Sequence, residues 1–524
     1  MSFQRFLIVQ ILLCMVKNSY ESRILVILPI PFKEHQTVYQ PLIENLHKHE
    51  HEITVLTTNP VFKSRDGIVF RNVTEIDLSF VYNLNILDEL RDVDLEGSEM
   101  LKTIFNVMRK IYEVELKSPK VEELFKLRAG HFDLVIVDWS GSSSLMNIFA
   151  HHFKVPLVAI TNGEAFPNVH EAFGNPSHPI SFPSVFLPFT KNLNLLQRIS
   201  SVLFTIWYRF YYFTEEIPLQ NEIIKNVLNE ENAPNMWEIA SSADLLLINS
   251  YEILNNIRPI VPTTIYLGGI HQKAELKPLS KSLKKFLDES ERVVYVSLSN
   301  GFHQDRHRFE KLLTTLEKFD VDIVWNINDD YINTTSRMYQ SNKIDQEGIL
   351  AHPKTILHVT DGGQRNIEDS IHHTVPVFGI SYTLIYDHYL QQIEKFECGL
   401  ISVIDFDNQN EVENKLEEII SSMRFKSNAV KLRNLIIDQP IGNSVERATW
   451  WINYVIRNGG TKHLLSEHKT LSWMKYLMLD VLFALLLGFA SMLFSFAYII
   501  ERIRRYSKSL PYEKVTRGSK SKVL

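Results

Sequence analysis

The chain has 524 residues, of which 45% are hydrophobic and 22% are charged. This length predicts two to four domains, and a globular composition of this kind excludes a disordered or fibrous protein. The formal net charge of −6 gives no basis for a nucleic-acid partner. With only two cysteines, Cys14 and Cys398, the chain lacks the residues for a disulfide framework or a cysteine-based zinc site.

The first 22 residues have the features of a secretory signal peptide. A single basic residue, Arg5, precedes the apolar stretch FLIVQILLCMV. A short apolar segment after a positive charge is typical of signals that direct a chain across a membrane and are then removed. We therefore expect residues 1–22 to be a signal peptide and the body that follows to be lumenal.

Residues 23–265 alternate short runs rich in aliphatic and β-branched side chains with longer amphipathic stretches. This alternation is typical of a parallel sheet flanked by helices. A helix is predicted over residues 36–49, and strands are predicted over residues 23–30, 52–57, 132–137 and 156–160. We expect an N-terminal Rossmann-like domain over residues 23–265.

Residues 197–213 (QRISSVLFTIWYRFYYF) are dense in aromatic side chains. The pattern has three interpretations: an ordinary core helix, the lining of a pocket for an apolar small molecule, or a segment that touches a membrane surface. The sequence leaves all three open.

A second α/β series follows a polar, lysine-rich stretch that we interpret as a linker over residues 266–290. Its predicted strands are residues 293–298, 322–326, 356–360 and 375–380. We expect a C-terminal Rossmann-like domain with closing helices over residues 291–470. Open parallel sheets bind ligands at the carboxyl ends of their strands, so a ligand is expected in the cleft between the two domains.

Residues 481–500 contain no charged side chain, and at about 1.5 Å per residue they span roughly the 30 Å of a bilayer core. We predict a transmembrane helix over residues 476–500. The tail, residues 501–524, holds eight basic and two acidic residues, which places it in the cytoplasm by the positive-inside rule.

This topology is type I, with a lumenal body and a short cytoplasmic tail. Two glycosylation sequons, at Asn72 and Asn333, are compatible with it. Lys520 and Lys522 near the C-terminus resemble the dilysine retrieval signal of endoplasmic reticulum membrane proteins. The alternative interpretation is a basic tail attracted to anionic lipid.

His35 is the strongest candidate for chemistry. It follows the first predicted strand, while Asp138 ends another predicted strand of the same sheet. A carboxylate in that position would orient an imidazole and stabilise its protonated form, as a general base requires. The alternative is a solvated loop histidine.

Other catalytic motifs are weak or missing. The chain has no GxGxxG, Walker or HExxH pattern. The spacing Asp-x-Asp occurs three times, for example at Asp320 and Asp322, and would suit a metal holding a diphosphate, but such charges are usually only solvated. A serine nucleophile in Asp138-Trp-Ser140-Gly-Ser142 is a weak alternative because GxSxG is not present.

Several segments resemble, in order and spacing, those of membrane-bound UDP-glycosyltransferases of the animal type, most closely those of insects. They are Asn249-Ser-Tyr251, Leu267-Gly-Gly-Ile-His271, residues 346–353 (QEGILAHP), Asp361-Gly-Gly363, residues 375–380 (VPVFGI) and the stretch from Lys462 to Trp473. The resemblance covers nearly the whole chain. It implies the GT-B fold: an α/β architecture with two Rossmann-like domains that face a cleft, the N-terminal one for a lipophilic acceptor and the C-terminal one for a UDP-sugar.

The resemblance also implies an inverting transfer without a metal or cofactor, in which the UDP-sugar is the co-substrate. His35 falls on the position of the family's histidine base and Asp138 on that of its aspartate. The donor diphosphate would rest on backbone amides at a helix N-terminus.

The donor-binding motif departs from the family's pattern near the uracil and diphosphate. Lys343 replaces the tryptophan that stacks on uracil, whereas Gln346 is retained. Asp361 replaces the histidine that contacts the diphosphate, and Ser299-Asn300 replaces Gly-Ser.

Further departures concern the ribose and the sugar. Asp369 replaces a ribose-binding glutamate, and Ile385-Tyr386 replaces the Asp-Gln pair that contacts the sugar hydroxyls, with Asp387 close by. The remaining donor positions implied by the resemblance are Gly362, Gly363 and Asn366.

Two functions follow from the sequence. The first is a UDP-glycosyltransferase of the endoplasmic reticulum membrane that transfers a hexosyl group to a hydroxyl of a small lipophilic acceptor, with His35 as general base. The second is a catalytically impaired relative that binds lipophilic ligands or partners an active transferase. Both interpretations allow homo- or hetero-oligomers with other transferases, and the retained His35 favours the first while the donor-site departures favour the second.

Overall fold

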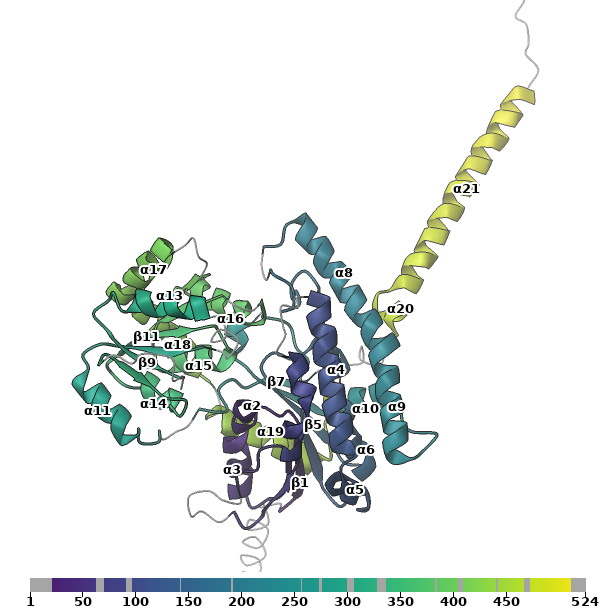
Figure 1. Ribbon diagram of the computed structural model, residues 1–524. Helices are drawn as coiled ribbons and strands as arrows, with labels where there is room; N and C mark the ends of the chain where they lie inside the picture. The colour runs from purple at the N-terminus through teal and green to yellow at the C-terminus, as the bar shows by residue number, and fades with distance from the viewer. Residues whose placement is uncertain are drawn as a thin grey trace, which may run out of the picture. The chain divides into compact units, whose positions relative to one another are not determined.

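The structure is a computed structural model that describes residues 21–62, 70–90, 97–141, 143–189, 192–255, 257–272, 276–298, 306–327, 336–381, 384–403, 409–439, 442–465 and 472–509. The chain divides into two compact units, residues 1–465 and 466–524. The first unit contains two parallel β-sheets with helices around them (Figure 1). The predicted signal peptide and the last fifteen residues of the tail lie outside the described residues, apart from Glu21 and Ser22.

The first sheet has the strand order β3-β2-β1-β4-β5-β6-β7, and all its pairs are parallel. Its strands are β1 (Arg23–Leu28), β2 (Glu52–Thr57), β3 (Val73–Asp77), β4 (Leu134–Asp138), β5 (Leu157–Asn162), β6 (Leu245–Asn249) and β7 (Thr264–Tyr266). The order reverses between β1 and β4, as in Rossmann-like sheets. All four strands predicted in this half of the chain are present within about two residues of their predicted ends.

The central strands β1, β4, β5 and β6 are buried on both faces, which explains their continuous apolar sequences. In β1, Leu25 and Ile27 pack into one core, whereas Ile24, Val26 and Leu28 pack into the other. The first core receives α4 (Gly97–Leu116), α5 (Pro119–Phe125), α6 (Ile148–Phe153), α7 (Pro167–Phe173), α8 (Leu195–Tyr211), α9 (Ile217–Leu228) and α10 (Met236–Ser241).

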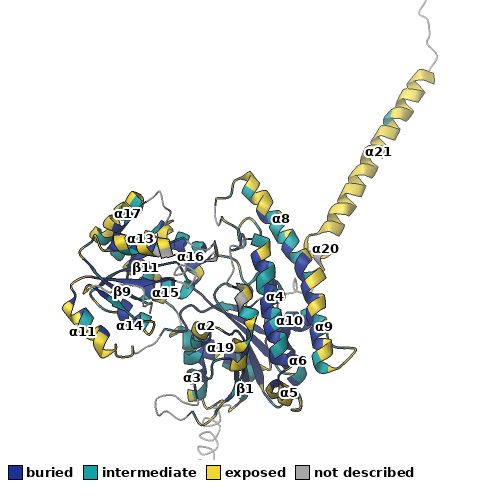
Figure 2. Ribbon diagram, viewed as in Figure 1, coloured by how far each residue is buried: buried dark blue, intermediate teal, exposed yellow. Residues whose placement is uncertain are grey.

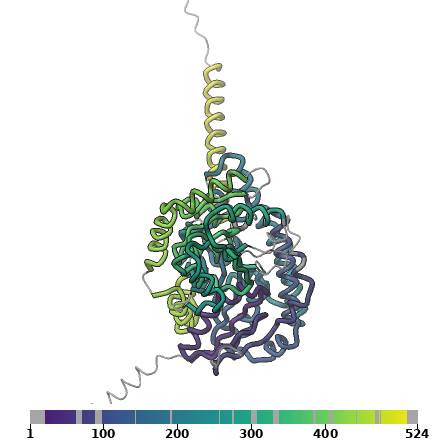
Figure 3. Tube along the Cα trace, turned by 60° about the vertical axis from the view of Figure 1, so that its left-hand side comes forward, coloured from purple at the N-terminus to yellow at the C-terminus, as the bar shows by residue number. Residues whose placement is uncertain are grey.

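The opposite face is covered by α3 (Gln40–Lys48) and by α19 (Ser444–Asn458), which lie side by side (Figure 3). Asn45 donates to Thr449 Oγ1 at 2.8 Å, and the ring of His51 bonds Asn453 at 2.9 Å. A helix from the far end of the first unit therefore completes the core of the N-terminal sheet.

The single helix predicted over residues 36–49 is two helices, α2 (Lys33–Thr37) and α3. Pro41 stands in the first turn of α3, where it has no N–H to donate and its ring disfavours a continuous helix through the preceding residues. His35 lies in the first of the two helices, α2.

The second sheet has the order β10-β9-β8-β11-β12-β13, again with parallel pairs only. The strands are β8 (Val293–Ser297), β9 (Asp322–Trp325), β10 (Met338–Gln340), β11 (Thr355–Thr360), β12 (Val377–Ile380) and β13 (Gly399–Ser402). The predicted strands of this half are confirmed. The two sheets also confirm the predicted fold class, α/β with two Rossmann-like domains.

Helices surround the second sheet as well. They are α11 (Lys281–Glu289), α13 (Arg306–Leu316), α14 (Gln346–Leu350), α15 (Gln364–His372), α16 (Leu384–Lys395), α17 (Gln409–Ser421) and α18 (Met423–Ile437). Helix α11 falls inside the stretch that the sequence predicts as a linker. Its Leu283 and Leu287 are buried against β8 and β9, so amphipathic spacing prevails over the polar composition of that stretch.

Helix α8 covers most of the aromatic stretch predicted from residues 197–213, and it continues into a π-helical turn at Tyr212–Glu216. It is not an ordinary core helix. Among its residues only Ser201, Tyr208 and Tyr211 are buried, and much of its outer side is exposed (Figure 2).

In the second unit, α20 (Trp473–Tyr476) is followed by α21 (Leu479–Ser509), a helix of 31 residues. By length and composition α21 could cross a membrane. It begins three residues after the start of the predicted span and extends nine residues past its end.

Candidate active site

The two residues predicted for catalysis lie at the point where the strand order of the first sheet reverses. Asp138 is the last residue of β4, and His35 lies in α2, just after β1. β1 and β4 are neighbours in the sheet. Ligands of open parallel sheets bind at this position, beyond the carboxyl ends of the strands.

His35 and Asp138 are in direct contact. Nε2 of His35 lies 2.7 Å from Oδ2 of Asp138. The aspartate side chain has no exposed surface, whereas 17% of the histidine side chain is exposed. The pair therefore has a buried carboxylate that orients a ring still reachable from outside, which is the arrangement a general base needs.

The other oxygen of Asp138 is also held by hydrogen bonds. Oδ1 accepts from the Tyr39 hydroxyl at 3.0 Å, from the Ser140 hydroxyl at 2.6 Å and from the Ser140 backbone N–H at 3.1 Å. Burial, and next the charge of Asp138, raise the pKa of Tyr39 well above its ordinary value, so its hydroxyl stays protonated and donates. These bonds fix the carboxylate plane that faces His35.

Ser140 therefore has a structural partner rather than the environment of a nucleophile. Its hydroxyl donates to Asp138 and accepts from the backbone N–H of Asn162 at 2.6 Å. The Asn162 side-chain amide lies 3.4 Å from Nδ1 of His35. Ser142 lies outside the described residues.

Gln36 anchors the short helix that carries His35. Its side-chain amide donates to the carbonyls of Leu28 and Ile30 at 2.9 and 2.8 Å, and its oxygen accepts from the Thr57 hydroxyl at 2.5 Å. Neither Gln36 nor Tyr39 was predicted from the sequence. The available signal was the polar run Thr57-Thr58-Asn59 at the end of β2, whose side chains need hydrogen-bond partners such as the glutamine beside His35.

In the second sheet, the turn Asp361-Gly-Gly363 lies at the equivalent point of reversal, between β11 and α15. Asp361 is buried, and Gly362 has a φ of 92°, where an added Cβ would meet Leu390 at 2.5 Å. Asn366 donates to the hydroxyl of Thr360 at 2.8 Å, which ties the first turn of α15 to the end of β11. The turn thus presents a helix N-terminus, which favours anions, next to a buried carboxyl group, which does not.

Asp369 is fully buried and engaged by other side chains. Its Oδ1 lies 2.8 Å from Nε2 of His271, and its Oδ2 accepts from the Gln346 amide at 2.7 Å, with Arg365 at 3.5 Å. Burial alone would raise the pKa of Asp369, but the charge and hydrogen bond of His271, the charge of Arg365 and the hydrogen bond of Gln346 together hold the pKa below its ordinary range. Gln346 and Asp369, both predicted for donor binding, are brought together and bond each other.

The remaining donor positions are spread around the same turn. Lys343 is exposed, and Asp387 accepts from the Ser381 hydroxyl at 2.8 Å. Burial raises the pKa of Asp387. Ile385 and Tyr386 lie in α16, with side chains outside the described part, and Ser299 and Asn300 also fall outside it.

The two halves are joined through Gln364, the first residue of α15. Its amide donates to the carbonyl of Asn249 at 2.7 Å and to Glu368 at 2.8 Å. Burial, opposed by His271 and the Gln364 hydrogen bond, raises the pKa of Glu368 to about 7.

No group of three or more histidine, cysteine or acidic side chains that could hold a metal occurs in the residues described here. Asp320 and Asp322 pair instead with Arg337, at 3.0 and 3.4 Å. Of the two predicted glycosylation sites, Asn72 is exposed just before β3, and Asn333 lies outside the described ranges.

Comparison with known sequences identifies one family over nearly the whole chain. The model of the family described as "UDP-glucoronosyl and UDP-glucosyl transferase" matches residues 24–514. UDP-glucosyltransferase 2 of Dactylopius coccus is 26% identical over 528 residues, covering 98% of this chain and 99% of the relative. UDP-glucuronosyltransferase 2B10 of Homo sapiens is 25% identical over 479 residues, covering 86% and 88%.

Solved structures show the same fold at low sequence identity. The glycosyltransferase VinC in complex with dTDP has a TM-score of 0.56 at 13% identity, over 83% of this chain and all of that one. UDP-glucose: anthocyanidin 3-O-glucosyltransferase in complex with UDP has a TM-score of 0.51 at 14% identity, over 84% and 100%. The expected GT-B fold is thereby confirmed. Because the family model matches nearly the whole chain, the protein belongs to the UDP-glucoronosyl and UDP-glucosyl transferase family.

Proposed function

We propose that this transferase moves a hexosyl group from a UDP-sugar to a hydroxyl of a small lipophilic acceptor, with His35 as the general base. The acceptor O–H gives its proton to the imidazole while its oxygen forms a bond to the anomeric carbon. The bond from that carbon to the diphosphate oxygen breaks on the opposite side, and UDP leaves with the electron pair. The configuration at the anomeric carbon is inverted.

The observation that carries the proposal is the 2.7 Å contact between His35 and the fully buried Asp138. When the imidazole takes a proton, the carboxylate beside it stabilises the new charge, and burial strengthens that interaction because water screens it less. Asp138 is thus a positioning residue, and His35 is the group that would touch the acceptor. As the resemblance implies, the reaction would use no metal or cofactor.

We further propose that the protein acts in the endoplasmic reticulum membrane, as a type I single-pass protein with a lumenal body. Support comes from α21, which could cross a bilayer, and from the basic residues that follow its apolar part. Asn72 is exposed on the body, as a lumenal glycosylation site must be.

The test is sugar transfer by the full-length chain in microsomes, with UDP-glucose and UDP-glucuronate offered separately against a panel of lipophilic phenols and alcohols. His35→Ala should lower transfer by about two to four powers of ten, the usual contribution of a general base. His49→Ala, an exposed histidine of the same domain, is the matched control and should transfer at the wild-type rate. Equal rates for His35→Ala and the wild type would remove His35 from the mechanism.

A second candidate function is favoured by the donor half of the site. Both oxygens of Asp369 already have partners within the protein: Oδ1 contacts His271, and Oδ2 accepts a hydrogen bond from Gln346. A ribose would have to compete with these partners. A protein of this kind would keep the fold and bind lipophilic ligands or an active transferase without turnover.

The two candidates differ in one result. A protein-dependent glycoside product from any UDP-sugar, abolished in His35→Ala, supports the transferase and ends the second candidate. Absence of product with every sugar, in a correctly folded chain that still binds acceptor-like phenols, supports the second.

A further inference from the structure

The exposed side of α8 carries a row of large apolar side chains from its first turn to its last. Six large apolar side chains on this helix are between 47% and 76% exposed: Leu195, Leu196, Ile199, Leu203, Ile206 and Phe210. At 100° per residue they fall within one stripe about 100° wide, the width of a face that a globular protein normally buries. We call these six residues the apolar stripe.

The inward side of the same helix carries polar groups that find partners. Ser201, Tyr208 and Tyr211 are buried, and the Tyr208 hydroxyl donates to Asn168 at 2.7 Å. The Tyr211 hydroxyl donates to the buried Glu216 at 2.9 Å. Rotating the helix to bury the stripe would turn these polar groups toward the outside and break their hydrogen bonds. The apolar stripe is therefore a built feature of the surface, not a core face left unpacked.

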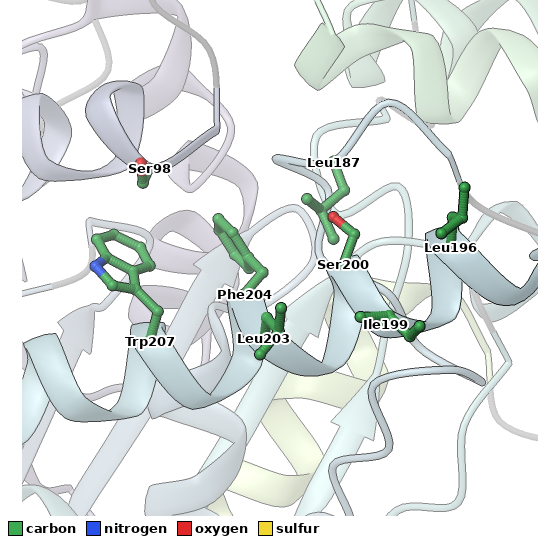
Figure 4. Close-up of a pocket in the computed structure, with 8 residues that line it drawn as sticks. All are labelled: Ser98, Leu187, Leu196, Ile199, Ser200, Leu203, Phe204 and Trp207. Carbon is green, nitrogen blue, oxygen red and sulfur yellow. The ribbon is translucent and has the colours of Figure 1, made fainter.

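Next to the stripe lies a shallow apolar hollow of about 460 Å³. Leu196, Ile199 and Leu203 of the stripe line it together with Phe204 and Trp207. Figure 4 shows these side chains along one helix, with Ser98 of α4 across from Phe204 and Trp207. Apolar residues bordered by a tryptophan are typical of helices that lie in the interface of a bilayer.

Charge on α8 has one sign. The helix contains Arg198 and Arg209 and no acidic residue. Arg209 pairs with Glu171 at 2.6 Å, whereas Arg198 is exposed at the border of the stripe. An arginine beside an apolar face suits the phosphate groups of phospholipids, which accept hydrogen bonds at the depth where such a face would end.

The chain that carries the stripe also contains a candidate membrane helix, α21. The first unit ends at Leu465 and α21 begins at Leu479, so at most about 50 Å of chain separates them at about 3.5 Å per residue. Since α21 could cross a bilayer, the tether keeps the body at a high local concentration near lipid, and even a weak second contact would be occupied.

We propose that the apolar stripe of α8 inserts into the interfacial region of the phospholipid bilayer, with Arg198 at the lipid phosphates, as a second membrane contact independent of α21. A lipophilic acceptor dissolved in the membrane would then be close to the domain that carries His35.

The experiment separates the two membrane contacts in the full-length chain. A protease recognition sequence is inserted after Leu465, the chain is reconstituted into phosphatidylcholine vesicles containing one fifth phosphatidylserine, and α21 is cut from the body only after folding. Flotation then measures the fraction of body that stays with the vesicles. The wild-type body should stay bound, and Leu203→Glu with Phe210→Glu should lower its bound-to-free ratio about a hundredfold or more.

The matched control is Leu435→Glu on α18, a leucine with 62% exposure outside the stripe, compared with 61% for Leu203. It should float like the wild type. Release of the wild-type body upon cleavage, or equal retention of the double variant, would overturn the proposal. Release of the wild-type body as a dimer that the double variant does not form would assign the stripe to a second copy of the chain and would also overturn it.

Discussion

The two sheets reverse their strand order in the same way, but the side chains near the two points of reversal make different contacts. In the first sheet, three donors hold one oxygen of Asp138, and the other oxygen faces His35, whose ring remains partly exposed. In the second sheet, the carboxylate of Asp369, in the helix that follows the turn, is bonded by both His271 and Gln346. The first site therefore has a reactive group directed outward, whereas the second is satisfied internally.

This difference teaches that two sheets of the same topology can hold the side chains at their strand ends in different ways. The Rossmann order places ligand-facing positions at the carboxyl ends of the central strands in both sheets, whatever residues occupy them. The residues then decide whether a ligand finds free hydrogen-bonding groups. Substitutions that break or strengthen the contacts of each half should show which half limits donor binding and which limits transfer.

The largest effect is expected from Asp361→His. A carboxylate about 4 Å from a phosphate charge costs about 1–4 kcal/mol, and a regained hydrogen bond to the diphosphate is worth about 1.5–3 kcal/mol. The substitution should therefore tighten UDP binding by about two to five powers of ten. Isothermal titration of UDP into the full-length chain measures this, with Asp320→His, an exposed aspartate of the same domain, as control. Unchanged affinity would show that Asp361 does not face the diphosphate.

Asp138→Asn should have the next largest effect. The amide keeps the shape of the side chain but cannot stabilise a protonated His35, so transfer should fall by about two to four powers of ten with little change in KM. Asp133→Asn, just before the other end of β4, is the control and should leave the rate unchanged. A loss confined to KM would assign Asp138 to acceptor binding instead.

Glu368 gives a pH-dependent stability. Its pKa rises from 4.5 to about 7 on burial, so the folded state binds more protons than the unfolded state between these values. The free energy of unfolding should then fall as pH rises from 4.5 to 7, by up to about 3 kcal/mol, and stay low above 7. Glu368→Gln removes this fall, and its melting temperature should exceed that of the wild type at pH 8 but not at pH 4.5.

The control for this measurement is Glu222→Gln, an exposed glutamate on α9. Its melting temperature should follow the wild type at both pH values. A constant offset of Glu368→Gln across the whole range would mean that Glu368 does not titrate in the folded protein.

The smallest effect is expected from Tyr39→Phe. It removes one of the three hydrogen bonds to Oδ1 of Asp138 and leaves both from Ser140, so kcat should fall about tenfold while KM stays constant. Tyr112→Phe is the control, because the Tyr112 hydroxyl is buried without a hydrogen-bond partner among the described residues. If both variants lose the same activity, the effect is one of packing and not of positioning Asp138.

Much of this site was predictable because the signals are local. Aliphatic and β-branched runs predict the strands. A histidine after one strand and an aspartate at the end of another predict a general base with a carboxylate partner at one edge of the sheet. Gln36 and Tyr39 were not predictable in the same way. Their partners are main-chain carbonyls and a carboxylate whose positions depend on how α2 leaves β1, and a single glutamine or tyrosine has no pattern of its own.

By itself, the sequence determined the two α/β halves, the strands, the candidate pair His35 and Asp138, and the long apolar helix near the C-terminus, since each follows from the order of side chains within a short segment. Only the tertiary structure decided that α19 completes the N-terminal core through Asn45 and Thr449, that Asp369 is held by His271, and that the apolar side of α8 faces outward. These depend on contacts between residues far apart in the chain or on which of two helix faces packs inward. Local periodicity specifies a face but not its partner.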